Sequence, residues 1–262
     1  MQDKMRVGIS TASLYPQETE KALRELANRG IKTVEIFFNA SCELDGNIFK
    51  EICNIVNDYA LDVVSVHPFT SPIEPIMLFS RYERRVGEIM EYYKRYFNAM
   101  GDLGAKIFVL HGAFKTGTCT YERYIERYWR LFQLGREFGI TVAQENVAYC
   151  LSSKIDLLTE MSRQLGDDVA FVLDIKQATR SGISPFELLD KLGNKIRHIH
   201  ISDNDEEHDC LPINSGSFDF KLLVSRLKAI NYNGALILEL YRNNYSTYDE
   251  LAVNIQSVEK LL

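Results

Sequence analysis

The sequence has few residues that would build a covalent framework, and it lacks long apolar runs. Its five cysteines are odd in number and widely spaced, so they form neither a disulfide framework nor a zinc-finger pattern. No apolar run approaches the roughly 18 residues of a membrane span. The first ten residues, MQDKMRVGIS, lack the apolar core of a secretory signal. We therefore expect a globular protein of the reducing cytoplasm, without a membrane partner.

An excess of charge of either sign is also missing. The 262 residues include 30 Lys and Arg against 36 Asp and Glu, which gives a formal net charge of −6, and like charges form no long block. This balance does not favour a nucleic-acid partner, although a local basic groove is compatible with it. With only 15 Gly and 6 Pro, the composition excludes collagen-like, low-complexity and disordered proteins.

Short β-rich runs alternate with longer helical patterns along the chain. Each run is rich in Val, Ile or Phe and is bounded by polar or glycine-containing segments, as buried parallel strands are. The predicted strands are 6–11, 33–38, 62–68, 106–112, 141–147, 169–175, 196–202 and 234–240. The predicted helices are 17–30, 82–103, 121–139, 154–165, 184–192, 218–230 and 248–261.

Eight strand–helix units in a chain of this length predict one (β/α)8 TIM barrel, an α/β fold that spans residues 1–262 as a single domain. No Pro-, Gly- or Ser-rich linker and no change of composition marks a domain boundary. The alternative fold is an open doubly wound sheet. However, Gly-x-Gly-x-x-Gly, the usual dinucleotide signature of that fold, does not follow the first predicted strand. The barrel is therefore preferred.

Ionisable side chains gather at the C-terminal ends of the predicted strands, where barrels of this kind carry their chemistry. On strands two to eight, in order, they are Glu35, His67, His111, Glu145, Asp174, His200 and Glu239. A single such residue is more often a satisfied polar group of the core or a helix cap. Buried charges are unfavourable unless they are paired or bind metal. Seven at matching strand ends favour one pocket with a carboxylate-rich metal site.

Ligand chemistry limits the metal without identifying it. Three carboxylates and one imidazole suit Mn²⁺, Mg²⁺, Co²⁺ or Zn²⁺. His67 and His111 would favour Zn²⁺ or another transition ion at a second position.

The segments that carry these residues are VVSVHPF, FVLHGAF, TVAQENV, FVLDIKQA, IRHIHISDND, LPINSGSFDF and GALILELY. Their order along nearly the whole chain resembles the xylose-isomerase-like barrel superfamily of sugar isomerases and epimerases, which also contains endonuclease IV. The resemblance implies that Glu145, Asp174, His200 and Glu239 are the four protein ligands of a divalent metal. It also implies that a sugar carbonyl and its neighbouring hydroxyl bind this metal, with Glu145 and Glu239 on opposite sides of the reacting carbon.

In such relatives one glutamate removes the proton next to the carbonyl, and the metal stabilises the enediolate that develops. Return of the proton to the other face gives an epimer, and return to the neighbouring carbon gives an isomer. We therefore predict a metal-dependent isomerase or epimerase whose partner is a small-molecule sugar or sugar phosphate. Dehydration of a keto-inositol belongs to the same mechanistic class. A barrel that binds a sugar without turnover is a further alternative, but the retention of both glutamates argues against it.

The same resemblance implies an alternative function, the hydrolysis of abasic DNA. His67, His111 and Glu145 match the ligands of a further zinc in endonuclease IV, and two ions would suit phosphodiester hydrolysis. The match is incomplete at that enzyme's third zinc, because Gln177 stands where the nuclease has histidine. The nuclease's later Asp-x-His pair aligns with the segment from His208 to Cys210. Both of these side chains can ligate metal, so Gln177, His208 and Cys210 are candidates for a third metal or for substrate contacts.

Sugar-acting relatives also differ from this chain. Several carry histidine at position 177, and an arginine shortly after the strand-seven histidine, where this chain has Ser202–Glu206 without arginine. The Gly-x-Gly of the following loop reads Asn214-Ser215-Gly216 here. The sequence therefore does not identify the sugar, its phosphorylation or the metal. It leaves the oligomeric state open, a homo-oligomer included.

Three residues near the strand ends have two interpretations each. His198 lies two residues before His200, and we expect it to fill the barrel layer beneath the site rather than to bind a ligand. Glu35 suits a metal ligand and a structural salt bridge equally well. Arg242 suits a contact with a carboxylate or substrate phosphate, or an exposed position at the surface.

The predicted helix 121–139 combines basic and aromatic residues without requiring a nucleic-acid site. Its three arginines recur at helical spacing among glutamates, which is typical of a solvated helix face. Its large aromatic residues are expected to pack the helix against the barrel. The arginines are Arg123, Arg127 and Arg130, and the aromatic residues are Tyr124, Tyr128 and Trp129.

Overall fold

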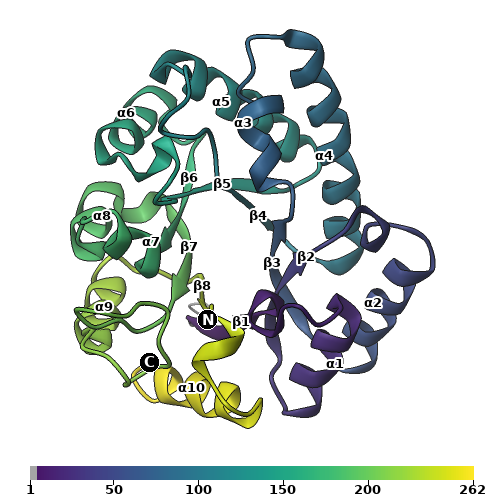
Figure 1. Cartoon of the computed structure of the whole chain (residues 1–262), viewed down its shortest axis with the longest axis vertical. Coiled ribbons are helices and arrows are strands. Elements are labelled where there is room, and N and C mark those ends of the chain that lie inside the picture. The colour runs from purple at the N-terminus through teal and green to yellow at the C-terminus, as the bar shows by residue number, and fades with distance from the viewer. Residues whose placement is uncertain (1–4) are drawn as a thin grey trace.

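The computed structural model describes residues 5–262, so residues 1–4 of the predicted domain lie outside the described residues. Eight parallel strands close into one barrel in the order of the sequence, and the last strand pairs with the first (Figure 1). The predicted (β/α)8 barrel is therefore confirmed. The strands are β1 (Arg6–Ser10), β2 (Thr33–Phe38), β3 (Asp62–Pro68), β4 (Ile107–Leu110), β5 (Thr141–Glu145), β6 (Ala170–Asp174), β7 (Ile196–Ile201) and β8 (Ala235–Leu238).

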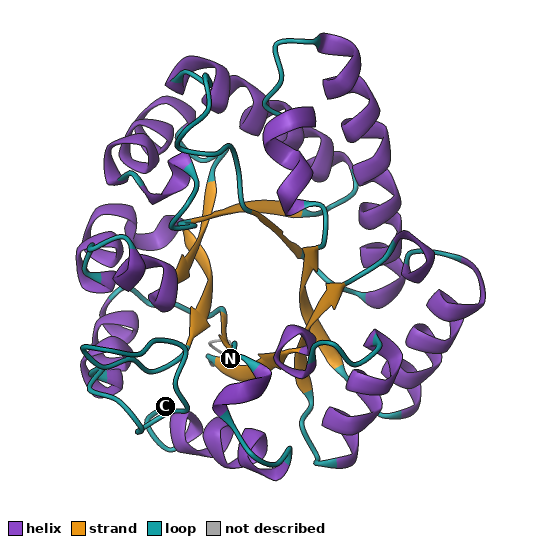
Figure 2. Cartoon of the chain, viewed as in Figure 1, coloured by secondary structure: helices purple, strands orange, loops and turns teal. Residues whose placement is uncertain are grey.

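An outer ring of helices surrounds the strands (Figure 2). Seven of these helices lie within the ranges predicted from the sequence, and α2, α3 and α7 lie outside those ranges. The helices are α1 (Thr19–Asn28), α2 (Gly46–Asp58), α3 (Glu74–Met77), α4 (Glu83–Leu103), α5 (Tyr121–Glu137), α6 (Ile155–Leu165), α7 (Ile175–Arg180), α8 (Pro185–Leu192), α9 (Phe220–Ala229) and α10 (Asp249–Glu259).

The junction between β6 and α7 differs from the prediction. The Oδ1 atom of Asp174 accepts a hydrogen bond from the backbone N–H of Gln177 at 2.8 Å, so Asp174 ends the strand and caps the helix. Ile175, predicted as the end of the strand, is consequently the first residue of α7. The buried strand β6 is therefore followed directly by α7, without a loop between them.

The main hydrophobic core joins residues of the strands and the surrounding helices, and Val64, Ala235 and Ile237 form a second, small cluster. Residues of β6 and β8 are buried throughout, as expected for parallel strands that are covered on both faces. Tyr124 and Tyr128 of α5 are fully buried. The hydroxyl of Tyr128 donates to the carbonyl of Val142 at 2.8 Å and accepts from the N–H of Ala170 at 2.9 Å. These two tyrosines therefore pack α5 against the barrel, as predicted.

Two residues of α5 do not follow the prediction. Trp129 is 43% exposed, because it lies one position further round the helix than the buried Tyr128. Arg127 is buried instead of solvated, because α4 covers this side of α5. Its guanidinium contacts the carboxylate of Glu83 in α4 and donates to the backbone carbonyl of Ser80 at 3.3 Å. Arg127 therefore connects two helices of the outer ring.

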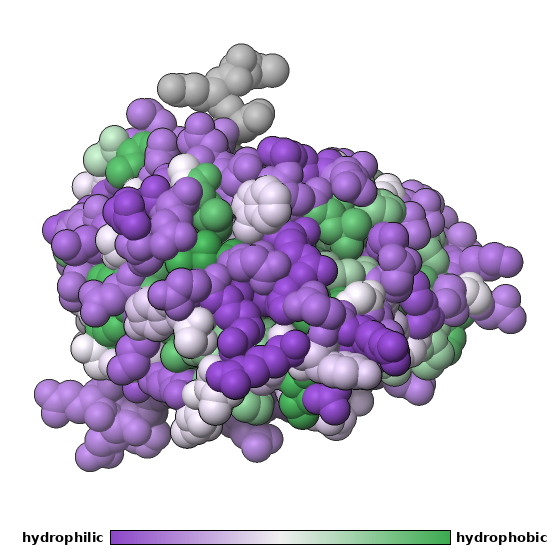
Figure 3. Space-filling model, turned by 90° about the horizontal axis from the view of Figure 1, so that it is seen from above, coloured by the Kyte–Doolittle hydropathy of each residue, from purple (hydrophilic) through white to green (hydrophobic). Residues whose placement is uncertain are grey.

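Within residues 5–262, no helix combines the length and the apolarity that crossing a bilayer requires. The side of the molecule in Figure 3 is mostly hydrophilic, and its hydrophobic groups form small separate patches. The large apolar side chains lie mainly in the core instead.

Candidate active site

Four of the predicted site residues converge where β5 to β8 end. Glu145 and Asp174 are the last residues of β5 and β6. His200 lies in β7, and Glu239 directly follows β8. The Nδ1 atom of His200 lies 3.1 Å from Glu145 Oε1, 3.7 Å from Asp174 Oδ2 and 3.8 Å from Glu239 Oε2. One imidazole nitrogen and three carboxylates from consecutive strand ends therefore face one another.

Backbone pairing sets the position of Asp174. The register of β6 and β7 places Asp174 opposite His200. The side chain of Asn146 accepts from the backbone N–H of Asp174 at 2.7 Å and donates to its carbonyl at 3.0 Å. Since Asp174 Oδ1 caps α7, only Oδ2 is directed toward the other site residues.

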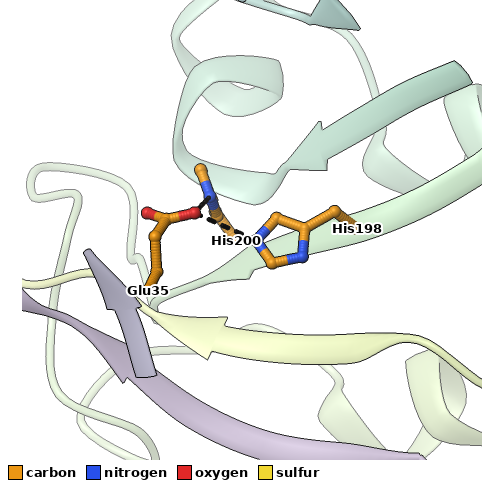
Figure 4. Close-up of side chains that lie close together, drawn as sticks. All are labelled: Glu35, His198 and His200. Carbon is orange, nitrogen blue, oxygen red and sulfur yellow. Dashed lines mark hydrogen bonds and ion pairs between the residues drawn. The ribbon is translucent and has the colours of Figure 1, made fainter. Parts of the chain in front are cut away.

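A layer of buried polar side chains lies beneath these four residues. Figure 4 shows Glu35 of β2 facing both histidines of β7, with dashed lines from one of its carboxylate oxygens to each ring. The Oε2 atom of Glu35 lies 3.1 Å from Nε2 of both His198 and His200, and it accepts from the hydroxyl of Ser65 at 2.8 Å. The contact with Glu35 orients the His200 ring, so that Nδ1 faces the site. His198 fills the layer beneath the site, as predicted, and Glu35 pairs with both histidines.

His67 and His111 form a second group with Glu145. The Nε2 atom of His111 lies 2.8 Å from Nε2 of His67 and 3.0 Å from Glu145 Oε2. The ring of Phe37 stacks on His67 with 4.6 Å between centroids, and the hydroxyl of Tyr149 lies 3.2 Å from His111 Nδ1. Two imidazoles beside a carboxylate offer a second place for a cation or for substrate hydroxyl groups.

Burial and charge act in opposite directions on these groups. Burial lowers the pKa of His200, but the carboxylates of Glu239 and Glu35 outweigh this effect and hold the pKa well above 6.5. Burial raises the pKa of Glu145, but His111 and His200 hold it well below its ordinary value. The pKa of Asp174, by contrast, is raised, because its burial outweighs the nearby cation of Lys176. A metal ion at Nδ1 of His200 would have to displace a proton from the ring.

Lys176, which the strand-end pattern does not single out, adds a cation to the site. The residue is 6% exposed. Its ammonium donates to Glu239 Oε2 at 3.0 Å and lies 3.6 Å from Asp174 Oδ2. The Tyr241 ring centroid is 5.4 Å from the same nitrogen. The available sequence signal was a lysine two residues after the strand-end Asp174 in FVLDIKQA, because a lysine at a buried position needs a partner.

A cavity of about 170 Å³ opens at this site. Its wall includes His67, His111, Glu145, Lys176 and Glu239. The remaining two site residues, Asp174 and His200, are each about 1% exposed and are buried behind this wall. The chemically active groups of the cavity are therefore carboxylates, imidazoles and one ammonium.

The three candidates for a third metal site do not lie together. Gln177 and Cys210 line the cavity. The side-chain oxygen of Gln177 accepts from the N–H of Ala148 at 3.0 Å. His208 lies in the loop between β7 and α9, lines a different hollow, and has Nδ1 3.2 Å from an oxygen of Asp205. The fold thus brings two of the three candidates to the cavity and places His208 outside it.

The sequence left the role of Arg242 open. In the structure its side chain contacts neighbouring residues near the surface. Its guanidinium packs over the rings of Tyr245 and Tyr248, at 4.8 and 5.1 Å from their centroids. It also donates to the carbonyl of Tyr245 at 2.9 Å. These contacts favour the surface interpretation of this residue.

The donor set fits a divalent cation. Glu145, Asp174 and His200 each offer one ligand atom, and these atoms lie within 4.8 Å of one another. Asp174 Oδ2 is buried without a hydrogen-bond partner in the part of the chain that the structure describes, and so is Glu145 Oε2, which faces His111 rather than His200. Unpartnered buried oxygens are unfavourable, and a cation would satisfy them. Oxygen and imidazole donors are compatible with Mn²⁺, Mg²⁺, Co²⁺ and Zn²⁺ alike.

Comparisons with known proteins agree with this architecture. The sequence profile of a family described as xylose isomerase-like TIM barrel matches residues 23–260. An uncharacterized protein of Methanocaldococcus jannaschii is 22% identical over 253 residues, which cover 90% of this chain and 83% of that protein. The inosose dehydratase of Clostridium beijerinckii is 22% identical over 255 residues, which cover 84% of this chain and 81% of that enzyme.

Solved structures share the fold over almost the whole chain. A D-tagatose 3-epimerase-like protein has a TM-score of 0.81 at 19% identity, covering 98% of this chain and 97% of that one. The IOLI protein with a bound zinc atom has a TM-score of 0.76 at 20% identity, covering 98% of this chain and 96% of that one. At these identities the likeness establishes the fold.

Proposed function

The chain belongs to the xylose isomerase-like TIM-barrel family, and on that premise we propose that it is a divalent-metal-dependent isomerase or epimerase of a sugar or sugar phosphate. One observation carries this proposal. Glu145 Oε1 and Asp174 Oδ2 are buried 3.1 and 3.7 Å from Nδ1 of His200, behind a small polar cavity, and Asp174 Oδ2 has no hydrogen-bond partner among the described residues. The epimerase-like and dehydratase relatives support the same class of carbon-acid chemistry.

A bound divalent cation would polarise the substrate carbonyl and stabilise negative charge on its oxygen. Glu145, Asp174 and His200 would hold this ion, with Glu239 as the fourth ligand that the sequence resemblance implies. Glu35 supports the arrangement from beneath, because it accepts a hydrogen bond from Nε2–H of His200 and so directs Nδ1 into the site.

Glu145 and Glu239 would move the proton. Both line the cavity, and they reach it from β5 and from the end of β8. One carboxylate removes the hydrogen from the carbon beside the carbonyl, and the C–H electrons pass to the carbonyl oxygen to give an enediolate. The other carboxylate returns a proton to the opposite face of that carbon for epimerisation. Return of the proton to the former carbonyl carbon gives isomerisation.

The group of His67, His111 and Glu145 supports a second candidate function. Its three ligand atoms also lie within 4.8 Å of one another, so it offers a place for a second ion. Two ions would favour hydrolysis of abasic DNA, in which one activates water and the other stabilises the leaving oxygen. In the isomerase, the same imidazoles would instead contact substrate hydroxyl groups. Dehydration of a keto-inositol is a variant of the first function, and the similarity to an inosose dehydratase supports it.

Solvent-exchange measurements test the proposed proton transfer. The Mn²⁺-loaded protein is incubated in D₂O with a panel of ketoses and ketose phosphates, and deuterium uptake at carbon is followed by NMR. We expect uptake with at least one substrate, and a loss of about 10²- to 10⁴-fold in Glu145→Gln and in Glu239→Gln. Glu187→Gln, an exposed carboxylate variant of α8, serves as the matched control.

Two results would contradict this proposal. Unchanged exchange in either site variant would refute the two-base mechanism. Efficient nicking of an abasic duplex, with two or more Zn²⁺ per chain and no exchange into any sugar, would establish the hydrolase instead.

A further inference from the structure

The three carboxylates around His200 are not equivalent. Glu145 and Asp174 each have a buried oxygen without a hydrogen-bond partner among the described residues. Glu239 has a partner, because its Oε2 accepts from the ammonium of Lys176 at 3.0 Å. Lys176 therefore pairs directly with Glu239 and lies farther, at 3.6 Å, from Asp174 Oδ2, whereas the nearest donor to Glu145 Oε2 is the imidazole of His111 at 3.0 Å.

Position separates Glu239 from the other two carboxylates as well. The side chains of Glu145 and Asp174 are 2% and 1% exposed, whereas that of Glu239 is 14% exposed. The compact ligand group consists of Glu145, Asp174 and His200 and does not include Glu239. Glu239, Lys176 and Glu145 line the cavity, which a substrate would enter, and Glu239 is the more exposed of the two glutamates. Glu239 therefore faces the substrate side of the site.

Lys176 is held in place and is not a mobile surface lysine. Its side chain is 7% exposed, and its ammonium lies near the Tyr241 ring as well as between Asp174 and Glu239. A divalent ion bound directly to Glu239 would share that carboxylate with the ammonium and place two cations close together. Repulsion between like charges at such distances is strong in a buried site. The pairing therefore opposes coordination by Glu239, whose Oε2 the ammonium contacts at 3.0 Å, whereas Asp174 Oδ2 lies beyond hydrogen-bond distance at 3.6 Å.

We propose that Lys176 keeps Glu239 out of the metal coordination sphere, so that Glu145, Asp174 and His200 alone bind the divalent cation. Three protein ligands leave positions open for the two oxygens of a sugar substrate. Glu239 then serves as a substrate-facing acid–base group that Lys176 positions. This inference rests on the proposed function, because it assigns roles within the same metal site, and it differs from the four-ligand set that the sequence resemblance implies in the role of Glu239.

Metal affinity separates a three-ligand site from a four-ligand site without measuring turnover. Mn²⁺ is titrated calorimetrically into the metal-free full chain and into Asp174→Asn, Glu239→Gln, Lys176→Met and the Lys176→Met/Glu239→Gln double variant. We expect Asp174→Asn to weaken binding by at least about tenfold and Glu239→Gln by less than about threefold. Lys176→Met frees Glu239 to coordinate, so we expect it to tighten binding by about tenfold.

The double variant distinguishes coordination from a general effect of charge. If Glu239 becomes a ligand only when Lys176 is absent, Glu239→Gln will weaken binding by about tenfold in the Lys176→Met background. A purely electrostatic effect of Lys176 would leave the effect of Glu239→Gln small in both backgrounds and would refute the positioning role. Lys176→Arg, which keeps the charge, should bind Mn²⁺ like the wild type. Lys195→Met, outside the site, is the matched control.

Two further outcomes have different meanings. Equal losses of affinity in Asp174→Asn and Glu239→Gln would overturn the three-ligand site and leave the proposed function intact. Failure of the wild-type chain to bind Mn²⁺ or Zn²⁺ would overturn both. Circular dichroism of each variant verifies that the barrel is folded, so that a loss of binding is not a loss of structure.

Discussion

Glu74, the first residue of α3, is fully buried beside the strand-end histidines. Its Oε2 accepts from the backbone N–H of Gly112 at 2.7 Å, and the hydroxyl of Tyr93 lies 3.4 Å from its Oε1. Gly112 has a φ of +104°, and a Cβ atom there would lie 1.9 Å from the hydroxyl of Tyr124. Glu74 therefore anchors a turn that only glycine can form, directly after His111.

The Glu74 carboxyl makes stability depend on pH. Burial raises its pKa from the ordinary value of 4.5 to about 8, although the Gly112 N–H lowers it in part. The folded state thus binds this proton more tightly than the unfolded state does. The contribution of protonated Glu74 to the free energy of unfolding is complete below about pH 4.5 and is lost as the pH rises toward 8.

We expect Glu74→Gln, which keeps an acceptor for Gly112 but does not titrate, to gain stability relative to the wild type as the pH rises from 5 to 8. The slope should reach at most about 1.4 kcal/mol per pH unit. Urea unfolding across this pH range measures the difference. Glu88→Gln, an exposed variant in α4, should follow the wild type. A difference between Glu74→Gln and the wild type that stays constant with pH would contradict this assignment.

At the scale of elements, Arg127 couples α5 to α4. Its side chain is 6% exposed and contacts Glu83 and the Ser80 carbonyl, whereas that of Arg130, on the same helix, is 35% exposed. Arg127→Met leaves the Ser80 carbonyl without this donor and removes a buried charge-assisted hydrogen bond. Glu83, which is 64% exposed, can be solvated instead.

We therefore expect Arg127→Met to lower the free energy of unfolding by about 1–3 kcal/mol. Arg130→Met, the matched variant at a more exposed position, should lower it by less than about 1 kcal/mol. Chemical denaturation measures both values. Equal effects of the two variants would show that the buried contacts of Arg127 do not contribute more to the free energy of unfolding than the exposed contacts of Arg130.

The sequence predicted most elements because their apolar periodicity is local. Buried parallel strands appear as continuous apolar runs, and the longer helices carry an apolar stripe. The helix α7 was missed because Ile175 continues the apolar run of β6, so that only the cap made by Asp174 separates the two elements. The four residues of α3 are too few to show a helical period. In α2 an apolar stripe is present, with Phe49, Ile52, Ile55 and Val56 buried, and could have been recognised.

At the scale of the whole molecule, a divalent cation would join β5, β6 and β7 through Glu145, Asp174 and His200. A ligand that binds only the folded chain stabilises it by about 2.7 kcal/mol at a hundred times its dissociation constant. For a domain of this size, that corresponds to a rise in Tm on the order of 5–10 °C.

We therefore expect Mn²⁺ to raise Tm and EDTA to reverse the rise, as measured by differential scanning calorimetry. His200→Ala should lose both the bound metal and the shift. A wild-type chain that binds Mn²⁺ without a change in Tm would mean that the ion also binds the unfolded chain or lies outside the barrel ends.

The sequence alone determined the barrel and the strand-end positions of its ionisable residues, because both depend on patterns within short segments. A charged residue at the end of an apolar run is conspicuous without knowledge of its neighbours. Only the tertiary structure decided which groups pair: Lys176 with Glu239, Glu35 with His198 and His200, Glu74 with Gly112, and Arg127 with Glu83. These contacts join segments that are mostly distant in the chain, and they depend on side-chain directions that packing sets. Local periodicity carries no information about such distances.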